Sequence, residues 1–164
     1  MNLYQDVIYQ NNIYLDPIIQ KIGCFFRSAC RLAELKVGEN LSAHELNELW
    51  EEAKRRKYIG TYRGEPNCVL KSAPIANLAL KKLGEENGYF LEVATDTGKG
   101  PVYYSSIKNR YCTDYIQKIK QGGPSQTHFR VVREDKSLIF DPFYPGIKNL
   151  GEIYTICYQY IKGE

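Results

Sequence analysis

The stretch His128-Phe-Arg-Val-Val-Arg-Glu-Asp-Lys-Ser-Leu-Ile-Phe-Asp141 determines how the C-terminal half of this chain is expected to fold. Apolar and β-branched residues flank Glu134-Asp135, which is typical of a β-hairpin with a two-residue turn. With that turn, pairing extends outward until His128 lies opposite Asp141. Directly opposed residues of an antiparallel pair share a face, with Cβ atoms roughly 4.5–5.5 Å apart. The sequence therefore predicts a carboxylate beside an imidazole at the open end of the hairpin.

The composition is typical of an ordinary globular protein, with 164 residues, 43% hydrophobic, 25% charged and a net charge of +3. This length fits a single domain, residues 1–164, able to bury roughly 70% of its unfolded surface. No apolar run approaches the roughly 20 residues of a membrane span. Residues Met1–Asp6 lack the basic and apolar regions of a signal peptide. We therefore expect no membrane partner.

The cysteine pattern indicates free thiols in a reducing compartment, and so a cytoplasmic location. The number of cysteines is odd and no two form a CxxC pair, which argues against a disulfide framework and against a zinc ribbon. They are Cys24, Cys30, Cys68, Cys112 and Cys157. None of the last four has a histidine nearby in sequence. We therefore expect neither a bound metal nor a cofactor.

The N-terminal half is predicted to be helical after an irregular or short helical lead-in over residues 1–20, in which Pro17 begins a turn of helix. A wide apolar face runs from Cys24 to Lys36. Ser42-Ala-His-Glu45 has the pattern of a capping box at the start of a second helix. Ser72 is expected to cap a third helix that ends near Gly84. The basic run Lys54–Lys57 is read as the end of the second helix, where the dipole favours cations, so nucleic-acid binding through it is not expected.

The C-terminal half is predicted to form strands. Tyr89–Thr95 and Ile153–Ile161 have the composition and alternation of strands. Residues 103–121 show a loose helical spacing of Ile107, Ile116 and Ile119, and Gly122–Ser125 then break the chain before the hairpin. Residues 58–67 are expected to form only a connector. Helices followed by an antiparallel sheet predict an α+β fold.

Cys24 is the candidate nucleophile because Gly23-Cys24 opens a helix, whose positive end lowers the pKa of a thiol. A histidine within hydrogen-bonding reach would serve as the general base, and a carboxylate would orient it. Cys24, His128 and Asp141 therefore read as a catalytic triad. The alternative is that Cys24 only contributes to the apolar helix face beside Phe25.

The supporting residues also have alternatives. His128 could be a histidine satisfied within the fold, and Asp141-Pro142 often simply begins a turn. Gln20, four residues before Cys24, could join the Cys24 backbone N–H in stabilising an oxyanion. His44 follows the cap of the second helix and is expected to be exposed.

Three segments resemble the papain-like cysteine peptidase clan, particularly the double-glycine leader peptidases of bacteriocin export. The closest resemblance is to an uncharacterised family of short phage- and plasmid-borne bacterial proteins. The segments are Gln20-Lys-Ile-Gly-Cys24-Phe-Phe-Arg-Ser-Ala-Cys-Arg-Leu-Ala-Glu34, Leu41-Ser-x-x-Glu-Leu46 and His128-Phe-x-Val-Val with Phe140-Asp-Pro142.

The resemblance implies a papain-like fold, with N-terminal helices packed on a C-terminal antiparallel sheet. It also implies hydrolysis of a peptide or protein substrate without a cofactor. Cys24 would be the nucleophile, His128 the base, Asp141 the orienting group and Gln20 the oxyanion donor. The leader peptidases usually have glycine where this chain has Phe25, and their oxyanion glutamine lies further upstream. The second possibility is a catalytically inactive papain-like module that acts as a phage- or plasmid-type protein-binding factor.

Overall fold

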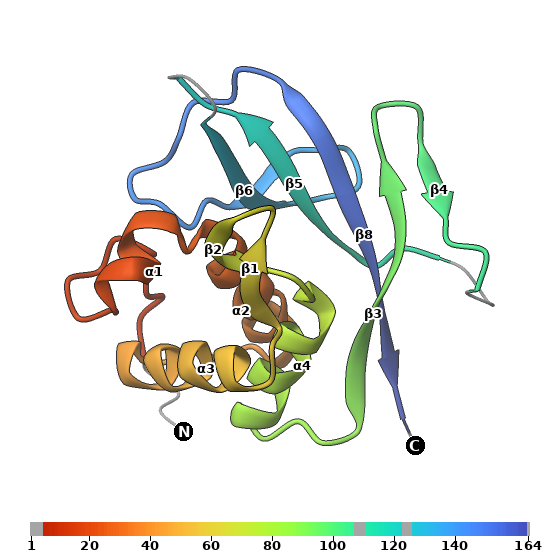
Figure 1. Cartoon of the computed structure of the whole chain (residues 1–164). Coiled ribbons are helices and arrows are strands. Elements are labelled where there is room, and N and C mark those ends of the chain that lie inside the picture. The colour runs from red at the N-terminus through yellow and green to blue at the C-terminus, as the bar shows by residue number, and fades with distance from the viewer. Residues whose placement is uncertain (1–4, 107–110, 123–125, 164) are drawn as a thin grey trace.

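The computed structural model describes residues 5–106, 111–122 and 126–163. All four helices of the described residues precede the main sheet, which confirms the expected α+β class with N-terminal helices and a C-terminal antiparallel sheet (Figure 1). Within these residues the helices are α1 (Pro17–Ile22), α2 (Cys24–Val37), α3 (Ala43–Arg55) and α4 (Ser72–Lys82). The strands are β1 (Ile59–Tyr62), β2 (Glu65–Val69), β3 (Gly88–Asp96), β4 (Pro101–Tyr103), β5 (Asp114–Lys120), β6 (Thr127–Val132), β7 (Leu138–Phe140) and β8 (Glu152–Lys162). None of the helices in the described ranges is long and apolar enough to cross a membrane.

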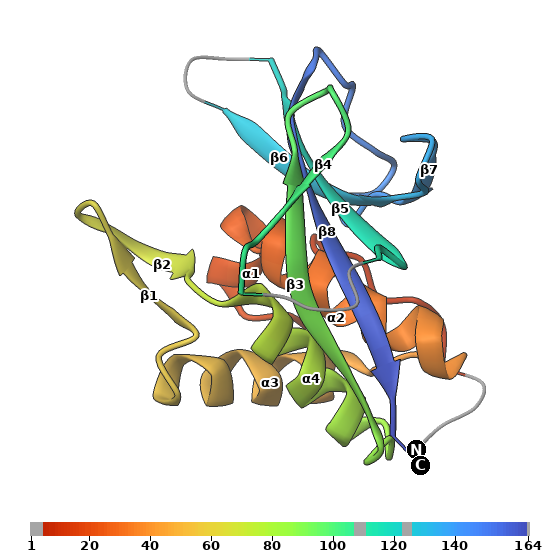
Figure 2. The ribbon, with the colours of Figure 1, turned by 90° about the vertical axis from the view of Figure 1, so that its right-hand side faces the viewer.

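The main sheet has six strands in the order β4-β3-β8-β5-β6-β7, and every neighbouring pair is antiparallel. Helix α2 packs against β5 and β6, and α4 packs against β3 and against α2. Helix α3 contacts α4 on the side away from the sheet (Figures 1 and 2). The site residues expected from the sequence therefore come from the helical layer and from the β6–β7 end of the sheet.

Helix α2 has a glycine at each end, for different reasons. Gly38 ends the helix in the left-handed conformation, with φ of 81°, which glycine adopts without a steric penalty. Gly23 lies between α1 and α2, where an added Cβ would be 2.5 Å from the Ile19 carbonyl oxygen. Glycine at position 23 therefore allows the two helices to meet directly, which sets the position of Cys24.

The capping box predicted for α3 is confirmed. The Ser42 hydroxyl accepts from the Glu45 backbone N–H at 3.1 Å, and the Glu45 carboxylate accepts from the Ser42 N–H at 2.9 Å. The cap predicted for α4 is wrong. Lys71 is the N-cap residue and makes no side-chain cap, whereas the Ser72 hydroxyl lies 2.6 Å from the Tyr158 hydroxyl. A tertiary hydrogen bond to β8 has taken the place of the local one.

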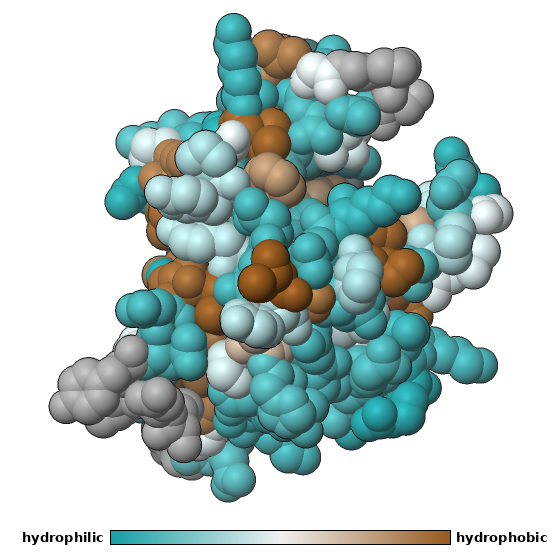
Figure 3. Space-filling model, turned by 90° about the vertical axis from the view of Figure 1, so that its left-hand side faces the viewer, coloured by the Kyte–Doolittle hydropathy of each residue, from teal (hydrophilic) through white to brown (hydrophobic). Residues whose placement is uncertain are grey.

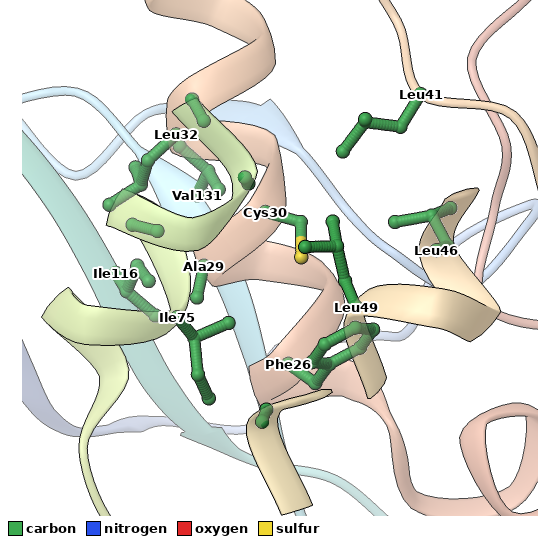
Figure 4. Close-up of a cluster of buried hydrophobic side chains, with 14 of the residues drawn as sticks. Phe26, Ala29, Cys30, Leu32, Leu41, Leu46, Leu49, Ile75, Ile116 and Val131 are labelled. Atoms are coloured by element: carbon green, nitrogen blue, oxygen red, sulfur yellow. The ribbon is translucent and has the colours of Figure 1, made fainter. Parts of the chain in front are cut away.

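The core lies between the helices and the sheet, and α2 contributes the largest share of it. Figure 4 shows Phe26, Ala29, Cys30 and Leu32 of α2 among apolar side chains from α3, α4 and the sheet. The Cys30 side chain is 0% exposed, and burial raises the pKa of its thiol to about 12. Cys30 is therefore a core residue.

Two segments have a different structure from the one expected. Residues 114–120 form strand β5 and not a helix, because Ile116 pairs with Ile156 of β8 and both side chains enter the core. Residues 59–69 form the β1–β2 hairpin in place of a connector. Its turn uses left-handed φ angles of 50° at Arg63 and 82° at Gly64. Ile107 and residues 123–125 lie outside the described residues.

The predicted register of the β6–β7 hairpin is wrong by two residues. A two-residue turn would pair Val131 with Leu138, but Val131 pairs with Phe140 and Val132 with Leu138. One added residue is Lys136, which extends the turn in a left-handed conformation with φ of 73°. The second shift is an irregularity between Val131 and Val132. Neither shift is marked by a glycine in the sequence.

Candidate functional site

Cys24 is the first residue of α2, at the end where the helix dipole is positive and the first N–H groups have no helical partners. Its side chain is partly exposed, in contrast to that of Cys30 on the same helix. The ring of the adjacent Phe25 stacks on Phe129 of β6, with centroids 4.0 Å apart. This stacking holds the N-terminus of α2 next to the strand that begins with Thr127 and His128.

His128 and Asp141 form a buried pair, as predicted from the sequence. The His128 Nε2 atom lies 2.7 Å from Asp141 Oδ1, and the two side chains are 4% and 7% exposed. The two side chains still meet although the predicted register was wrong. The two one-residue shifts together move Asp141 two positions from direct opposition to His128, so both side chains still point to the same face of the sheet. Diagonal neighbours of this kind are about 7–8 Å apart at Cα, within reach of long side chains.

His128 interacts with both Asp141 and Cys24. Burial lowers the pKa of His128, but the hydrogen bond to Asp141 and the neighbouring Cys24 side chain raise it from 6.5 to about 9. Because Nε2 faces Asp141, Nδ1 is the ring nitrogen left for Cys24. The three residue types expected from the sequence are thus brought together in the order thiol, imidazole and carboxylate.

Asp141 is fixed by the chain that follows it. Its Oδ1 accepts from the Phe143 backbone N–H and its Oδ2 accepts from the Ile147 N–H, each at 2.9 Å. Burial works to raise the pKa of Asp141, but the bond to His128 and these backbone donors lower it. Asp141 therefore does begin a turn, and the same turn holds the carboxylate in its charged form beside the imidazole.

Cys24 and His128 line one groove of about 790 Å³. Its walls are the start of α2, the C-terminal end of β5, the N-terminal end of β6, the loop after β7, and the β1–β2 hairpin. Figure 3 shows a notch between the projecting hairpin and the sheet end, with apolar atoms in its wall. The lining is mainly apolar and aromatic, and its charged members are Lys21, Glu65 and Lys118. The hairpin, expected only as a connector, supplies one entire side.

Lys118 gives the groove a fixed positive charge close to His128. Its Nζ lies 5.4 Å from the ring centroid of Phe129 and 5.3 Å from that of Tyr154. Aromatic faces attract cations, so these two rings hold the ammonium group in the groove. Lys118 was not predicted from the sequence because the spacing of apolar residues in its segment indicated a helix.

Gln20 does not line the groove. Its side-chain Nε2 donates to the Leu15 carbonyl oxygen at 2.8 Å, within the lead-in and α1. Three other glutamines line the groove, Gln10, Gln121 and Gln126, and the buried one is Gln10. Gln10 is 3% exposed and donates through Nε2 to the Gln20 carbonyl oxygen at 3.2 Å. No sequence signal distinguishes Gln10, because it reaches the groove through a long-range hydrogen bond from its backbone N–H to the Pro142 carbonyl oxygen.

The remaining cysteines lie in separate environments. Cys68 is on β2 and lines the same groove as Cys24. Its thiol donates to the carbonyl oxygens of Glu65 and Pro66. Cys112 precedes β5 and does not lie in a helix, as its segment had been expected to. Its Sγ lies 3.5 Å from the Tyr103 hydroxyl, in a small cluster with Cys157.

A second hollow, of about 670 Å³, lies on the outer surface of α3 and α4. Charged side chains dominate its lining, including His44, Glu48 and Lys82, and Lys82 forms an ion pair with Glu48 at 3.1 Å. The lining of this second hollow includes neither a thiol nor a buried histidine–carboxylate pair. Within the described ranges, no cluster of three or more histidine, cysteine or acidic residues could hold a metal ion. The groove of Cys24 is therefore the stronger candidate site.

Comparisons of the chain with protein-family models, with curated proteins and with solved structures found no match. The function is therefore inferred from the geometry and chemistry of the groove alone.

Proposed function

We propose that the protein is a thiol hydrolase that cleaves a peptide or other amide bond in this groove, through Cys24, His128 and Asp141. The observation that carries the proposal is the position of His128, which is bonded to Asp141 through Nε2 and lines the same groove as Cys24. A histidine paired with a carboxylate on one side and a thiol on the other can hold the thiol as a thiolate. The relationship to papain-like peptidases is part of the same proposal.

In the first half of the reaction, the Cys24 thiolate attacks the substrate carbonyl carbon, and the carbonyl oxygen becomes an oxyanion. The backbone N–H of Cys24, at the positive end of α2, is a donor suited to that oxyanion. Protonated His128 then gives its proton to the leaving amine as the C–N bond breaks. The products are a free amine and a thioester on Cys24.

In the second half, neutral His128 takes a proton from water, and the hydroxide attacks the thioester carbonyl. The C–S bond breaks, the acid product leaves, and the thiolate–imidazolium pair is restored. Asp141 stays ionised throughout because two backbone N–H groups and His128 all stabilise its charge. It keeps the imidazole in one orientation and stabilises its charged form. No metal or cofactor is needed for these steps.

The test is the pH dependence of iodoacetamide alkylation, followed by mass spectrometry at each cysteine. Cys24 should react fast at about pH 6, and His128→Ala should move its reactivity to the ordinary thiol range near pH 8.5. Cys68 is a control within the same molecule, because it lines the same groove but its thiol donates only to backbone carbonyl oxygens. Equal pH profiles for Cys24 and Cys68 would contradict the proposal.

Turnover is tested separately with a library of peptides prepared from a cell lysate. The wild-type protein should cut a subset of these peptides, and Cys24→Ala should cut none. The cellular location proposed for this activity is the cytoplasm, which is supported by the five free cysteines.

The second candidate function is a non-catalytic module that binds another protein. It is favoured by exposed apolar side chains of the N-terminal segment and α1, where Ile13 is 77%, Tyr14 75% and Ile22 46% exposed. Of these three, Ile22 also lines the groove. A Cys24 thiol that is inert in the alkylation test, together with a stoichiometric complex with a protein partner, would favour this function over hydrolysis.

A further inference from the structure

Lys118 lies on the side of the sheet that faces the helices. It is paired with Phe129 of β6 and with Tyr154 of β8, and directly opposed residues of an antiparallel pair share a face. Ile116, two residues earlier on β5, points the same way and belongs to the core. A charged side chain therefore occupies the position on β5 where the apolar row of the core ends at the groove.

Lys118 differs from the other lysines of the described residues in having partial burial without a carboxylate. Only Lys118 and Lys136 among them are partly buried, and the rest are exposed. Lys136 forms ion pairs with Asp96 at 3.1 Å and with Glu152 at 2.7 Å. Lys118 forms no ion pair with any described residue, and its contacts are with two aromatic rings. Charged groups withdrawn from water are usually paired, so this lysine needs an explanation.

The two aromatic rings hold the ammonium group near the start of α2. Its Nζ lies 5.4 Å from the ring centroid of Phe129 and 5.3 Å from that of Tyr154, and both rings line the groove. The Phe129 ring stacks on Phe25, the residue after Cys24. The rings fix the position of the charge, but they supply no oxygen acceptor for its three N–H donors.

We propose that Lys118 is a specificity-determining residue that binds a carboxylate of the ligand in the groove. The ligand is then a peptide that carries either an acidic side chain or a free C-terminal carboxylate at this position. This deepens the proposed function by naming the class of substrate. It rests on that function only in placing a peptide in the groove of Cys24.

A carboxylate provides both of the things that Lys118 lacks, an opposite charge and oxygen acceptors for its N–H groups. A neutral amide would supply an acceptor without the charge, and an ammonium group would be repelled. The attraction is stronger here than on an open surface, because the largely apolar lining leaves less water to screen it. The other charged members of the lining, Lys21 and Glu65, are exposed and therefore better screened.

The experiment uses immobilised Cys24→Ala protein, in which Cys24 cannot cleave the probes, and three libraries of short acetylated peptides with otherwise uncharged residues. The first library has a central Glu and an amidated C-terminus. The second differs only in a central Gln, and the third has the central Gln and a free C-terminal carboxylate. Mass spectrometry measures how strongly each library is retarded on the column. At least one carboxylate library should be retarded about fivefold more than the amidated Gln library, as expected for a charge-assisted hydrogen bond.

Variants made in the Cys24→Ala protein locate the effect. Lys118→Met should abolish the preference for carboxylates, and Lys118→Arg, which keeps the charge, should retain it. Lys120→Met is the matched control, because Lys120 lies on the same strand, is exposed and does not line the groove, so the preference should stay unchanged. If Lys118→Met does not fold, Lys118→Gln serves as the second neutral variant.

The libraries also identify the source of the carboxylate. Preference for the Glu library indicates an acidic side chain, and preference for the third library alone indicates the C-terminus of a peptide. Equal retardation of all three libraries, no retardation of any of them, or a preference that persists in the neutral variants of Lys118 would overturn the inference.

The failure of the proposed function would give a different result. An inert Cys24 in the alkylation test, together with a preference for carboxylates that depends on Lys118, would remove the hydrolase and keep the carboxylate site, now in a binding module. A reactive Cys24 without any preference for carboxylates would keep the hydrolase and remove the role of Lys118.

Discussion

Two buried pairs of opposite charge among the described residues have the same length and different surroundings. Arg27 Nη2 lies 2.7 Å from Glu34 Oε1 inside the helical layer, and both side chains are 0% exposed. His128 Nε2 lies 2.7 Å from Asp141 Oδ1 at the end of the sheet, and both side chains are nearly buried. Distance and burial alone do not distinguish one pair from the other.

The difference lies in what else each pair contacts. The Glu34 carboxylate also accepts from Arg31 and from the Leu41 backbone N–H, and Arg27 Nε donates to the Ile8 carbonyl oxygen. These bonds connect α2 to the N-terminal segment and to the start of α3. The His128 pair instead leaves one ring nitrogen for Cys24 in an open groove. A buried charge pair therefore indicates a functional site only where one of its members still faces a reactive group.

The largest effect is expected for Arg27→Met, because it leaves the Glu34 carboxylate buried without its main partner. Removing one member of a buried ion pair costs about 3–5 kcal/mol of unfolding free energy. Chemical denaturation followed by circular dichroism measures it. Arg27→Met combined with Glu34→Leu should recover part of the loss, and a cost for the single variant below about 1 kcal/mol would contradict the structural role.

Asp141→Asn should have a smaller effect on stability and a clear effect on Cys24. The amide can replace only one of the two oxygens that accept from Phe143 and Ile147, so one buried N–H loses its partner, at about 1–3 kcal/mol. Loss of the charge should also lower the pKa of His128. Alkylation of Cys24 at about pH 6 should therefore slow by tenfold or more, and unchanged alkylation would show that Asp141 does not act on Cys24 through His128.

The two cysteines of α2 sharpen the comparison further. Cys30→Ala removes a fully buried sulfur and leaves a cavity, and we expect a loss of about 1–2 kcal/mol with the reactivity of Cys24 unchanged. Cys24→Ala should change the unfolding free energy by less than about 0.5 kcal/mol, because Cys24 is partly exposed. If Cys24→Ala is the more destabilising of the two, Cys24 belongs to the core and not to a site.

The pH dependence of stability should differ between the two pairs. The pKa of His128 is raised to about 9 in the folded protein, so its stabilising contribution is complete below pH 6.5 and is lost as the pH rises through about 9. The unfolding free energies of wild type and His128→Gln should therefore converge between pH 6 and pH 9.5. The difference between wild type and Arg27→Met should stay constant over that range, because arginine remains charged.

The smallest effect is expected for Gln20→Ala. Its amide bonds to the Leu15 carbonyl oxygen and Gln20 does not line the groove, so turnover should fall by less than about twofold. A loss of about 10²–10³ in kcat, typical for an oxyanion donor, would restore the role that the sequence assigned to Gln20. Peptide cleavage assays at saturating substrate measure it.

The sequence by itself determined the elements whose signals are local. The Ser42 capping box, the glycine after α2 and the apolar face of α2 depend on residues within one or two helical turns, so they are readable without tertiary structure. The contact between His128 and Asp141 was also predictable, although its register was not. Side chains alternate along a strand with a period of two, so an error of two residues leaves the face unchanged.

The tertiary structure alone decided the surroundings of that contact. Lys136 adopts its left-handed turn conformation while its ammonium group pairs with Asp96 and Glu152, from two other strands. Gln10 reaches the groove because its backbone bonds to Pro142, far along the chain, and Trp50 reaches it through the packing of α3 on α2. These positions depend on partners distant in sequence, which no local pattern of residues can specify.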